Sequence, residues 1–398
     1  MININLESYK KSKGIAFFQS GFRPFFLLAA FYAILAMTFW GGIYLFQWKL
    51  PLHRVSSMTW HAHEMVFGYG MAVIAGFLLT AVRNWTKQQT ADGILLAYLM
   101  ILWILGRIPP INLPIAYLQE IADVSFNMVL IFVIAKPLYI RKMKAQWVVV
   151  VVLFALFLAN IGYYMSVFQI IELAPSTFVY IGLFTILNLL FVFGRRLIPN
   201  FTNSALRPKV EIKNRDLIDK VLMPLFLIFS INEVVFQNEI LTFGLSTILF
   251  ILNTIRVIDW YRPEIWKNNL IWSLWFGYTF LTLGFLVKMG EFTFAVSPFL
   301  GIHMFAVGGL GMIATSMMAR VGYGHSGRNI FNMTPAVRWS FIGIILAVIF
   351  RVIFPIFFPS QYTLWIGIAM TSWIFGFATF FLIFFYVFVK ARPDGAYG

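Results

Sequence analysis

Residues 60–82 of the chain read WHAHEMVFGYGMAVIAGFLLTAV, with two histidines and a glutamate directly before a long apolar run. The rest of this stretch holds no charged side chain and approaches the ~20 residues that an α-helix needs to cross a bilayer. Ionisable groups are costly inside a membrane and are kept mostly where they bind or conduct something. His61, His63 and Glu64 are therefore the first candidates for a functional site.

The whole chain has the composition of a polytopic membrane protein. Of its 398 residues, 61% are apolar and only 11% are charged, and the mean hydropathy is +0.83. Soluble globular domains of this length do not have such a composition. The chain has no Cys, which excludes disulfides, thiolate-bound haem, cysteine iron–sulfur clusters and thiol catalysis. A metal would have to be held by His, carboxylate or Met side chains.

Apolar windows of roughly 20 residues predict an all-α fold of about twelve transmembrane helices in a single domain, residues 1–398. The windows fall at about 22–46, 58–82, 92–107, 117–137, 146–168, 174–194, 217–237, 240–258, 268–288, 296–319, 335–358 and 362–390. The polar residues 1–20 are expected to form a cytoplasmic tail, since they lack the apolar core of a cleaved signal peptide. The polar stretch 195–220 is expected to be a central cytoplasmic loop between two halves.

The basic residues predict the orientation of the chain. With both termini in the cytoplasm, all but five of the 30 Lys and Arg residues fall on the cytoplasmic side, as the positive-inside rule requires. The net charge of +15 is thus a topology signal that also attracts anionic lipid head groups. No clustered basic domain indicates a nucleic-acid partner. The five basic residues on the outer side are Lys49, Arg54, Arg107, Lys288 and Arg351.

The histidines gather on the same outer side. His61 and His63 are separated by about 200° around a helix, so they are expected to point to opposite faces and cannot both hold one small metal ion on an intact helix. Glu64 could accept a hydrogen bond from the His61 ring and orient it. The alternative is that all three are interfacial polar residues beside Trp60. The four outer histidines are His53, His61, His63 and His303.

The remaining histidines are more isolated candidates. His303 opens another apolar window at the same predicted depth and could be a second ligand. His53 could join a copper site with Met58 or Met65, because imidazole and thioether both suit that metal, although a solvated loop residue is the alternative. His325 lies in a glycine-rich turn, GYGHSGR at 322–328, on the cytoplasmic side.

Two arginines and several acids complete the candidates. Arg107 could clamp a carboxylate of a bound cofactor, or it could merely extend to the membrane surface. Arg23 could also contact a cofactor, with a positive-inside anchor as the alternative. Asp123 and Glu233 could line a proton path, and hydrogen bonding between helices is the equal alternative.

Several motifs taken together resemble the NnrS family. The WHAHE block at residues 60–64 and the GHSGR turn at residues 324–328 are the most specific of them. The resemblance spans residues 21 to about 330 and also includes GFRPFF (21–26), GFLLTAV (76–82) with NWT (84–86), GR (106–107), and RRLIP (195–199) with FT (201–202).

This resemblance implies a multi-pass protein of the bacterial inner membrane that contains haem b and copper. It also implies a part in the nitric oxide response, either in nitrosative-stress protection or in denitrification. Nitric oxide or a related small molecule would be the ligand, and a membrane or periplasmic partner would donate electrons. A nitric oxide reductase-type oxidoreductase is one form of this function. A small-solute transporter and a non-catalytic haem-based nitric oxide-binding protein are the alternatives.

The candidate residues take roles within this expectation. The metal ligands would come from His61, His63, His303, His53 and His325. Arg107 and Arg23 would contact the cofactor, and Glu64 and Asp123 would be catalytic groups that supply protons.

Overall fold

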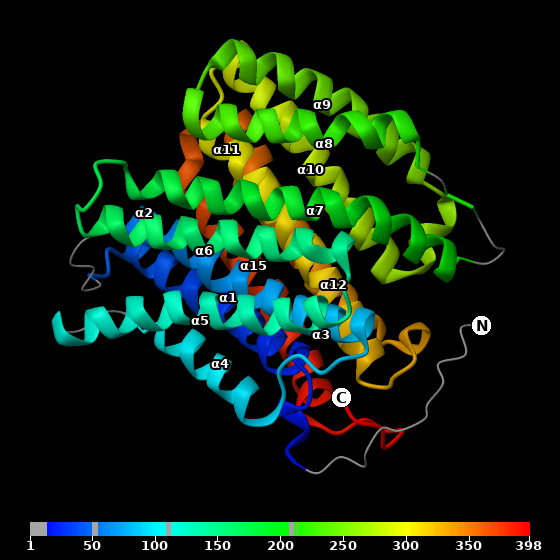
Figure 1. Ribbon diagram of the computed structural model, residues 1–398. Coiled ribbons are helices and arrows are strands. Elements are labelled where there is room, and N and C mark those ends of the chain that lie inside the picture. Colours follow the sequence, from blue (N-terminus) through cyan, green and yellow to red (C-terminus); the bar gives the residue numbers. More distant parts are fainter. Residues whose placement is uncertain (1–13, 50–54, 109–112, 207–210, 213) are drawn as a thin grey trace.

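The computed structural model describes residues 14–49, 55–108, 113–206, 211–212 and 214–398, and it forms a bundle of long helices (Figure 1). No β-strand occurs in these residues. Ten helical segments within them are long and apolar enough to cross a membrane. The predicted all-α, polytopic fold is confirmed.

The first half of the described chain contains α1 (Phe22–Phe46), α2 (Ser57–His63), η2 (Glu64–Gly70), α3 (Met71–Thr86), α4 (Gly93–Leu105), α5 (Leu113–Ile140), α6 (Val148–Val167) and α7 (Pro175–Ala205). The second half contains α8 (Asp216–Ile231), η4 (Asn232–Phe236), α9 (Glu239–Trp260), α10 (Asn269–Phe294), α11 (Pro298–His303), η6 (Met304–Gly311), α12 (Met312–His325), α13 (Arg338–Val348), η9 (Ile349–Ile353), α14 (Phe354–Phe357) and α15 (Tyr362–Val389). Short 3₁₀ turns connect them at η1 (Ala16–Phe18), η3 (Lys144–Trp147), η5 (Pro263–Lys267), η7 (Ile330–Asn332), η8 (Pro335–Val337) and η10 (Pro359–Gln361).

Each of the twelve apolar windows contains a helix, but the predicted central loop is shorter than expected. α7 continues to Ala205 and α8 begins at Asp216, so much of the stretch 195–220 is helical. Hydropathy marks where a helix leaves the apolar layer and not where its hydrogen bonding ends. The two windows outside the ten long apolar segments are α4, with 13 residues, and α8, with 16.

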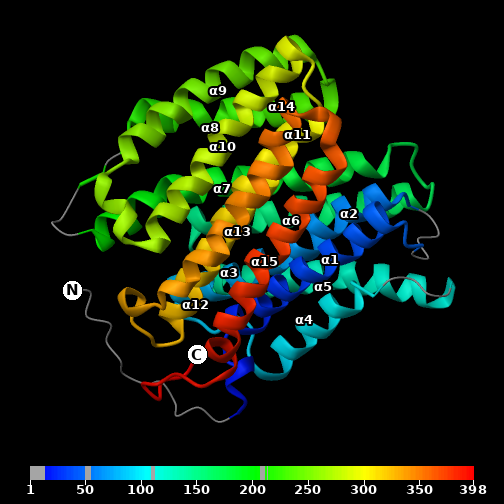
Figure 2. The ribbon, with the colours of Figure 1, turned by 180° about the vertical axis from the view of Figure 1, so that it is seen from behind.

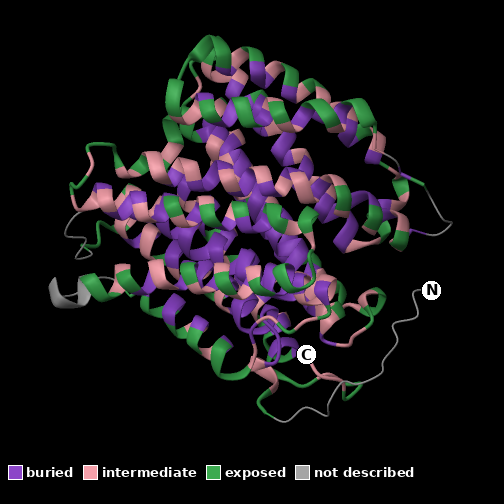
Figure 3. Ribbon diagram, in the orientation of Figure 1, coloured by how far each residue is buried: buried purple, intermediate pink, exposed green. Residues whose placement is uncertain are grey.

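The two spans that carry His61 and His303 lie at the centre of the bundle. In Ser57–Thr86, 83% of the most apolar window is buried, and in Pro298–His325 the fraction is 72%. The corresponding value for the span that contains α15 is 33% (Figure 3). α1 packs along α15 and α3, and α10 packs along α9, η6 and α12 (Figure 2). The histidines are thus set on interior helices and not on the lipid-facing rim.

Four segments of the bundle are π-helical, and each holds or directly follows an ionisable residue. η2 follows His63, η6 follows His303, η4 contains Glu233 and η9 contains Arg351. A π-helical segment widens the helix, and such segments are frequent at functional sites. The widened turns therefore mark positions where the bundle departs from uniform packing to place polar side chains.

Candidate functional site

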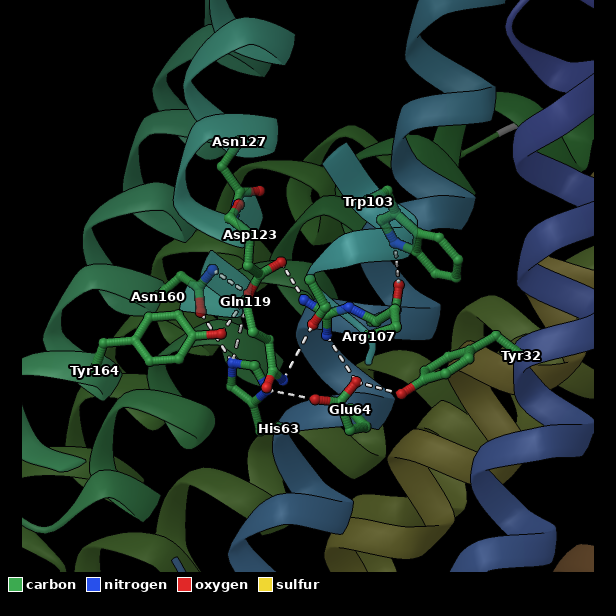
Figure 4. Close-up of polar contacts among 12 residues, drawn as sticks. Tyr32, His63, Glu64, Trp103, Arg107, Gln119, Asp123, Asn127, Asn160 and Tyr164 are labelled. Atoms are coloured by element: carbon green, nitrogen blue, oxygen red, sulfur yellow. Dashed lines mark hydrogen bonds and ion pairs between the residues drawn. The ribbon is translucent and has the colours of Figure 1, made fainter. Parts of the chain in front are cut away.

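A buried polar cluster joins α1, α2, η2, α5, α6 and the turn after α4 (Figure 4). All of its members are buried. We call it the closed cluster, and it consists of Tyr32, His63, Glu64, Arg107, Asp123, Asn160 and Tyr164.

Local sequence sets this geometry. The Ser56 hydroxyl caps the start of α2 by accepting from the Thr59 amide at 3.1 Å. One turn beyond Glu64 lies Gly68, where a Cβ atom would come within 2.7 Å of a Tyr32 ring carbon and 3.1 Å of Arg107 Nη1. Only a glycine lets those two side chains reach the glutamate without displacement.

Arg107 binds both carboxylates of the closed cluster. Its Nη1 donates to Glu64 Oε2 at 2.7 Å, and its Nη2 pairs with Asp123 Oδ1. The Tyr32 hydroxyl donates to the same glutamate oxygen. The sequence predicted that Arg107 clamps a cofactor's carboxylate, but the protein's own carboxylates take that place. They do so because α5 brings Asp123 against the turn after α4.

His63 is fully engaged inside the closed cluster. Its Nδ1 lies 3.0 Å from Glu64 Oε1, and its Nε2 lies 3.0 Å from Asn160 Oδ1. Asn160 donates its Nδ2 to Asp123 Oδ2 at 2.9 Å, which turns its oxygen toward the histidine. Both ring nitrogens thus face side-chain oxygen atoms of the closed cluster. Both His63 nitrogens already contact protein atoms, so the predicted ligand role, which stays a prediction, would require one of these contacts to open.

His61 points away from this cluster, as the predicted 200° rotation requires. Its ring stacks on Trp40 of α1 with 4.6 Å between ring centres, whereas His63 stacks on Tyr163 of α6 at 4.0 Å. The Nδ1 of His61 is buried and has no hydrogen-bond partner. Glu64 was expected to orient His61, but its hydrogen bonds go to His63, Tyr32 and Arg107 instead.

His303 lies near His61 although the two are far apart in sequence. Its Nδ1 lies 2.6 Å from the Phe299 carbonyl oxygen, which can only accept, so the ring hydrogen sits on Nδ1 and Nε2 is left as an acceptor. The two histidines and Arg351 lie within electrostatic range of one another, and η9, which carries Arg351, packs against α11, which ends at His303. We call His61, His303 and Arg351, together with the rings of Trp40 and Tyr362, the open site.

The open site offers two imidazoles and no third ligand of the usual kinds. Among the residues that the structure describes, no three His, Asp or Glu side chains converge well enough to hold a metal ion. His53, the predicted further copper ligand, lies outside the described residues. Metal binding at the open site would therefore rest on His61 and His303.

Two other predicted residues lie at the opposite end of the bundle. Arg23 donates to the backbone carbonyls of Phe388 at 2.8 Å, Lys390 at 2.6 Å and Gly398 at 2.8 Å. It thus anchors the C-terminal segment, and the predicted cofactor contact stays a prediction. His325 contacts Asn84 there, with 3.2 Å between His325 Nε2 and the Asn84 side-chain nitrogen, far along the bundle from the other described histidines. It is unsuited to a shared metal site.

A comparison with known protein families decides the assignment. The model of a family described as NnrS protein matches residues 16–392, nearly the whole chain. The chain belongs to the NnrS family. Membership suggests a multi-pass membrane protein of the nitric oxide response. A search of curated proteins found no match. In this NnrS protein the WHAHE block faces the open site with His61 and the closed cluster with His63 and Glu64, while the GHSGR turn lies at the other end.

Sequence reasoning missed several members of these sites, among them Tyr32 of the closed cluster and the rings of Trp40 and Tyr362 in the open site. Asn160 and Tyr164 are ordinary residues of an apolar window and become polar partners only when α6 packs beside α5. Arg351 was noted only as an outer basic residue. Its signal was available, because an arginine inside a membrane span is a functional candidate by default.

Proposed function

We propose that this NnrS protein holds haem or copper at the open site through His61 and His303, and that it binds or reduces nitric oxide there. The observation that carries the proposal is the state of the two imidazoles. His303 keeps Nε2 free because Nδ1 donates to a carbonyl, and His61 keeps a buried nitrogen without a partner.

The residues fit such a group on chemical grounds. A histidine that binds a metal usually donates its other ring N–H to a carbonyl or carboxylate, as His303 does to Phe299. Imidazole suits both haem iron and copper, so the chain needs no thiolate to hold either of them. When bound, iron or copper would supply nitric oxide coordination and electron exchange. Trp40 would fix the plane of the His61 ring by stacking on it.

Reduction of two nitric oxide molecules to nitrous oxide and water consumes two electrons and two protons. We assign the proton supply to the closed cluster, in which Glu64 Oε1 and His63 Nδ1 share a hydrogen two residues along the same helix from His61. Asp123 would hold the far side of this network through Asn160 and Tyr164. Electrons would come from a membrane or periplasmic donor.

The experiment is a cofactor inventory of four purified full-length proteins: wild type, His61→Ala, His303→Ala and His325→Ala. Pyridine haemochrome spectra and copper analysis are expected to show cofactor in wild type and in His325→Ala, with a large loss in the other two. The His325 variant is the matched control, because that ring is half-buried at the other end of the bundle.

Two results would end the proposal. One is a wild-type protein, isolated from membranes, that contains neither haem nor copper. The other is full cofactor retention in both His61→Ala and His303→Ala. Nitrous oxide production from nitric oxide, with an electron donor present, then separates reduction from binding alone.

A further inference from the structure

Among the described residues, Arg351 is a half-buried cation that differs from three other interior cations because no acid neutralises it, and it lacks the backbone carbonyls that Arg23 binds. Arg107 pairs with Glu64 and Asp123, Lys288 pairs with Glu233 at 2.7 Å and Glu291 at 2.6 Å, and Arg256 pairs with Asp219. Within the part of the chain that the structure describes, no carboxylate lies within 4.0 Å of the Arg351 guanidinium. Its Nη1 is buried without a hydrogen-bond partner.

The surroundings of Arg351 hold no compensating charge. The groups around it are the imidazoles of His61 and His303 and the phenols of Tyr44 and Tyr362, of which Tyr362 is hydrogen-bonded to it. Its guanidinium carbon lies 5.8 Å from the centre of the Tyr362 ring, which softens the charge but does not cancel it. An arginine set among neutral groups inside a membrane span is expensive, and such residues are kept for function.

Three helical spans and the end of α1 converge on this positive charge. His61 comes from α2, His303 ends α11, and Arg351 lies in the π-helical η9 that packs against α11. His61 Nδ1 and Arg351 Nη1 are both buried and unpaired. The region that these residues share carries the positive charge of Arg351 and is only partly covered, since all three residues retain some exposure.

We propose that the open site binds a planar oxyanion, with Arg351 as the residue that takes its oxygen atoms. The guanidinium presents parallel N–H donors that match the two oxygens of a carboxylate or of nitrite. A metal held by His61 and His303 would add positive charge and increase the need for an anion. The inference thus deepens the proposed function but does not require it, because the unpaired arginine is part of the chain itself.

The oxyanion has two sources with the same chemistry: a free ion such as nitrite, or a carboxylate carried by a bound cofactor. The test uses the purified full-length protein as wild type, Arg351→Gln, Arg351→Lys and Arg320→Gln. Arg320 is the matched control, because it is also half-buried in a membrane span with an unpaired Nη1, but it stacks 3.8 Å over Phe201. Each protein is titrated with sodium nitrite by calorimetry, and its haem content is measured.

If the anion is free, nitrite binds wild type, and Arg351→Gln weakens its affinity about tenfold or more, while Arg320→Gln does not. Arg351→Lys keeps the charge but loses the parallel N–H donors of the guanidinium, so its nitrite affinity should fall between those of wild type and Arg351→Gln. If the anion belongs to a cofactor, wild type does not bind nitrite, and Arg351→Gln loses most of its haem while Arg320→Gln retains it. Either result supports the inference.

The inference is overturned if Arg351→Gln matches wild type in both nitrite affinity and haem content. Its failure can be told apart from failure of the proposed function. A wild type without haem or copper that binds nitrite through Arg351 would refute only the cofactor proposal. If His61→Ala loses the cofactor, but Arg351→Gln keeps the nitrite affinity and the haem content of wild type, only the oxyanion site is refuted. Equal elution of all variants in size-exclusion chromatography shows that the comparison is between folded proteins.

Discussion

His61 and His63 are two residues apart, yet their surroundings are opposite in kind. His63 lies in the closed cluster, where both ring nitrogens have partners and two carboxylates share one arginine. His61 lies in the open site, where one ring nitrogen is unpaired and the neighbouring Arg351 has no acid beside it. Both sites lie in interior spans of the same bundle.

The difference indicates how the chain divides its polar residues. A buried network in which every polar group has a partner fixes helices relative to one another and leaves no polar atom free to bind a ligand. An unsaturated site costs stability unless something else completes it. We therefore expect variants of the closed cluster to affect folding first, and variants of the open site to affect ligand content first.

The largest effect is expected from Arg107→Leu. This change leaves Glu64 and Asp123 buried without their cation, and breaking a buried ion pair from one side costs about 3–5 kcal/mol. Equilibrium unfolding in mixed detergent, followed by Trp fluorescence, measures the loss. Arg351→Leu is the comparison, and it should cost much less, because it leaves the neutral Tyr362 side chain behind and no buried carboxylate. Equal losses for the two variants would contradict the division into closed and open sites.

His63→Ala should be next in size and should separate the two histidines directly. It removes the donors that face Glu64 Oε1 and Asn160 Oδ1, and hydrogen bonds to charged groups are worth about 1.5–3 kcal/mol. Stability should fall while haem and copper content stay at the wild-type level. His61→Ala should show the reverse pattern. Loss of cofactor from His63→Ala without loss of stability would show that the two roles are exchanged.

The smallest effect is expected from Gly68→Ala, which tests how tightly the closed cluster is packed. The new methyl group would meet a Tyr32 ring carbon at 2.7 Å and Glu64 Oε2 at 3.0 Å, and such overpacking costs about 1–3 kcal/mol. Gly244→Ala in α9 is the matched control, because a Cβ there meets nothing within 4 Å and alanine favours a helix. The changes in unfolding free energy relative to wild type should therefore have opposite signs in the two variants. Equal values would mean that the cluster is looser than its contacts indicate.

The sequence predicted the fold far better than the sites. Apolar windows located the helices because hydropathy over ~20 residues is a strong, local signal. The opposite directions of His61 and His63 also followed from helix geometry alone. The pairing of Arg107 with Asp123 did not, since it depends on how α5 packs against the turn after α4.

The contacts that the sequence could not foresee share a physical cause. Arg107 and Arg23 were predicted to contact a cofactor because a lone arginine in a membrane protein needs acceptors. In the structure a distant helix and distant backbone carbonyls supply acceptors to them. Arg351 was overlooked for the converse reason. Arg351 is a candidate because no described carboxylate lies beside it. That depends on how the helices pack and cannot be seen in the sequence around it.

The π-helical turn of η2 has a consequence for how this chain can vary in length. Each residue of an α-helix advances the side-chain direction by about 100°, whereas a π-helical residue, bonded i→i+5, advances it by less. The seven residues of η2 therefore turn the chain about as far as six α-helical residues would. Deleting one residue between Glu64 and Gly70, with a return to ordinary α-helical bonding, should leave His61 and His63 close to their present directions relative to α3. An insertion has no such outlet and should turn His61 from Trp40 and His63 from Asn160 together, so single deletions there should be better tolerated than insertions.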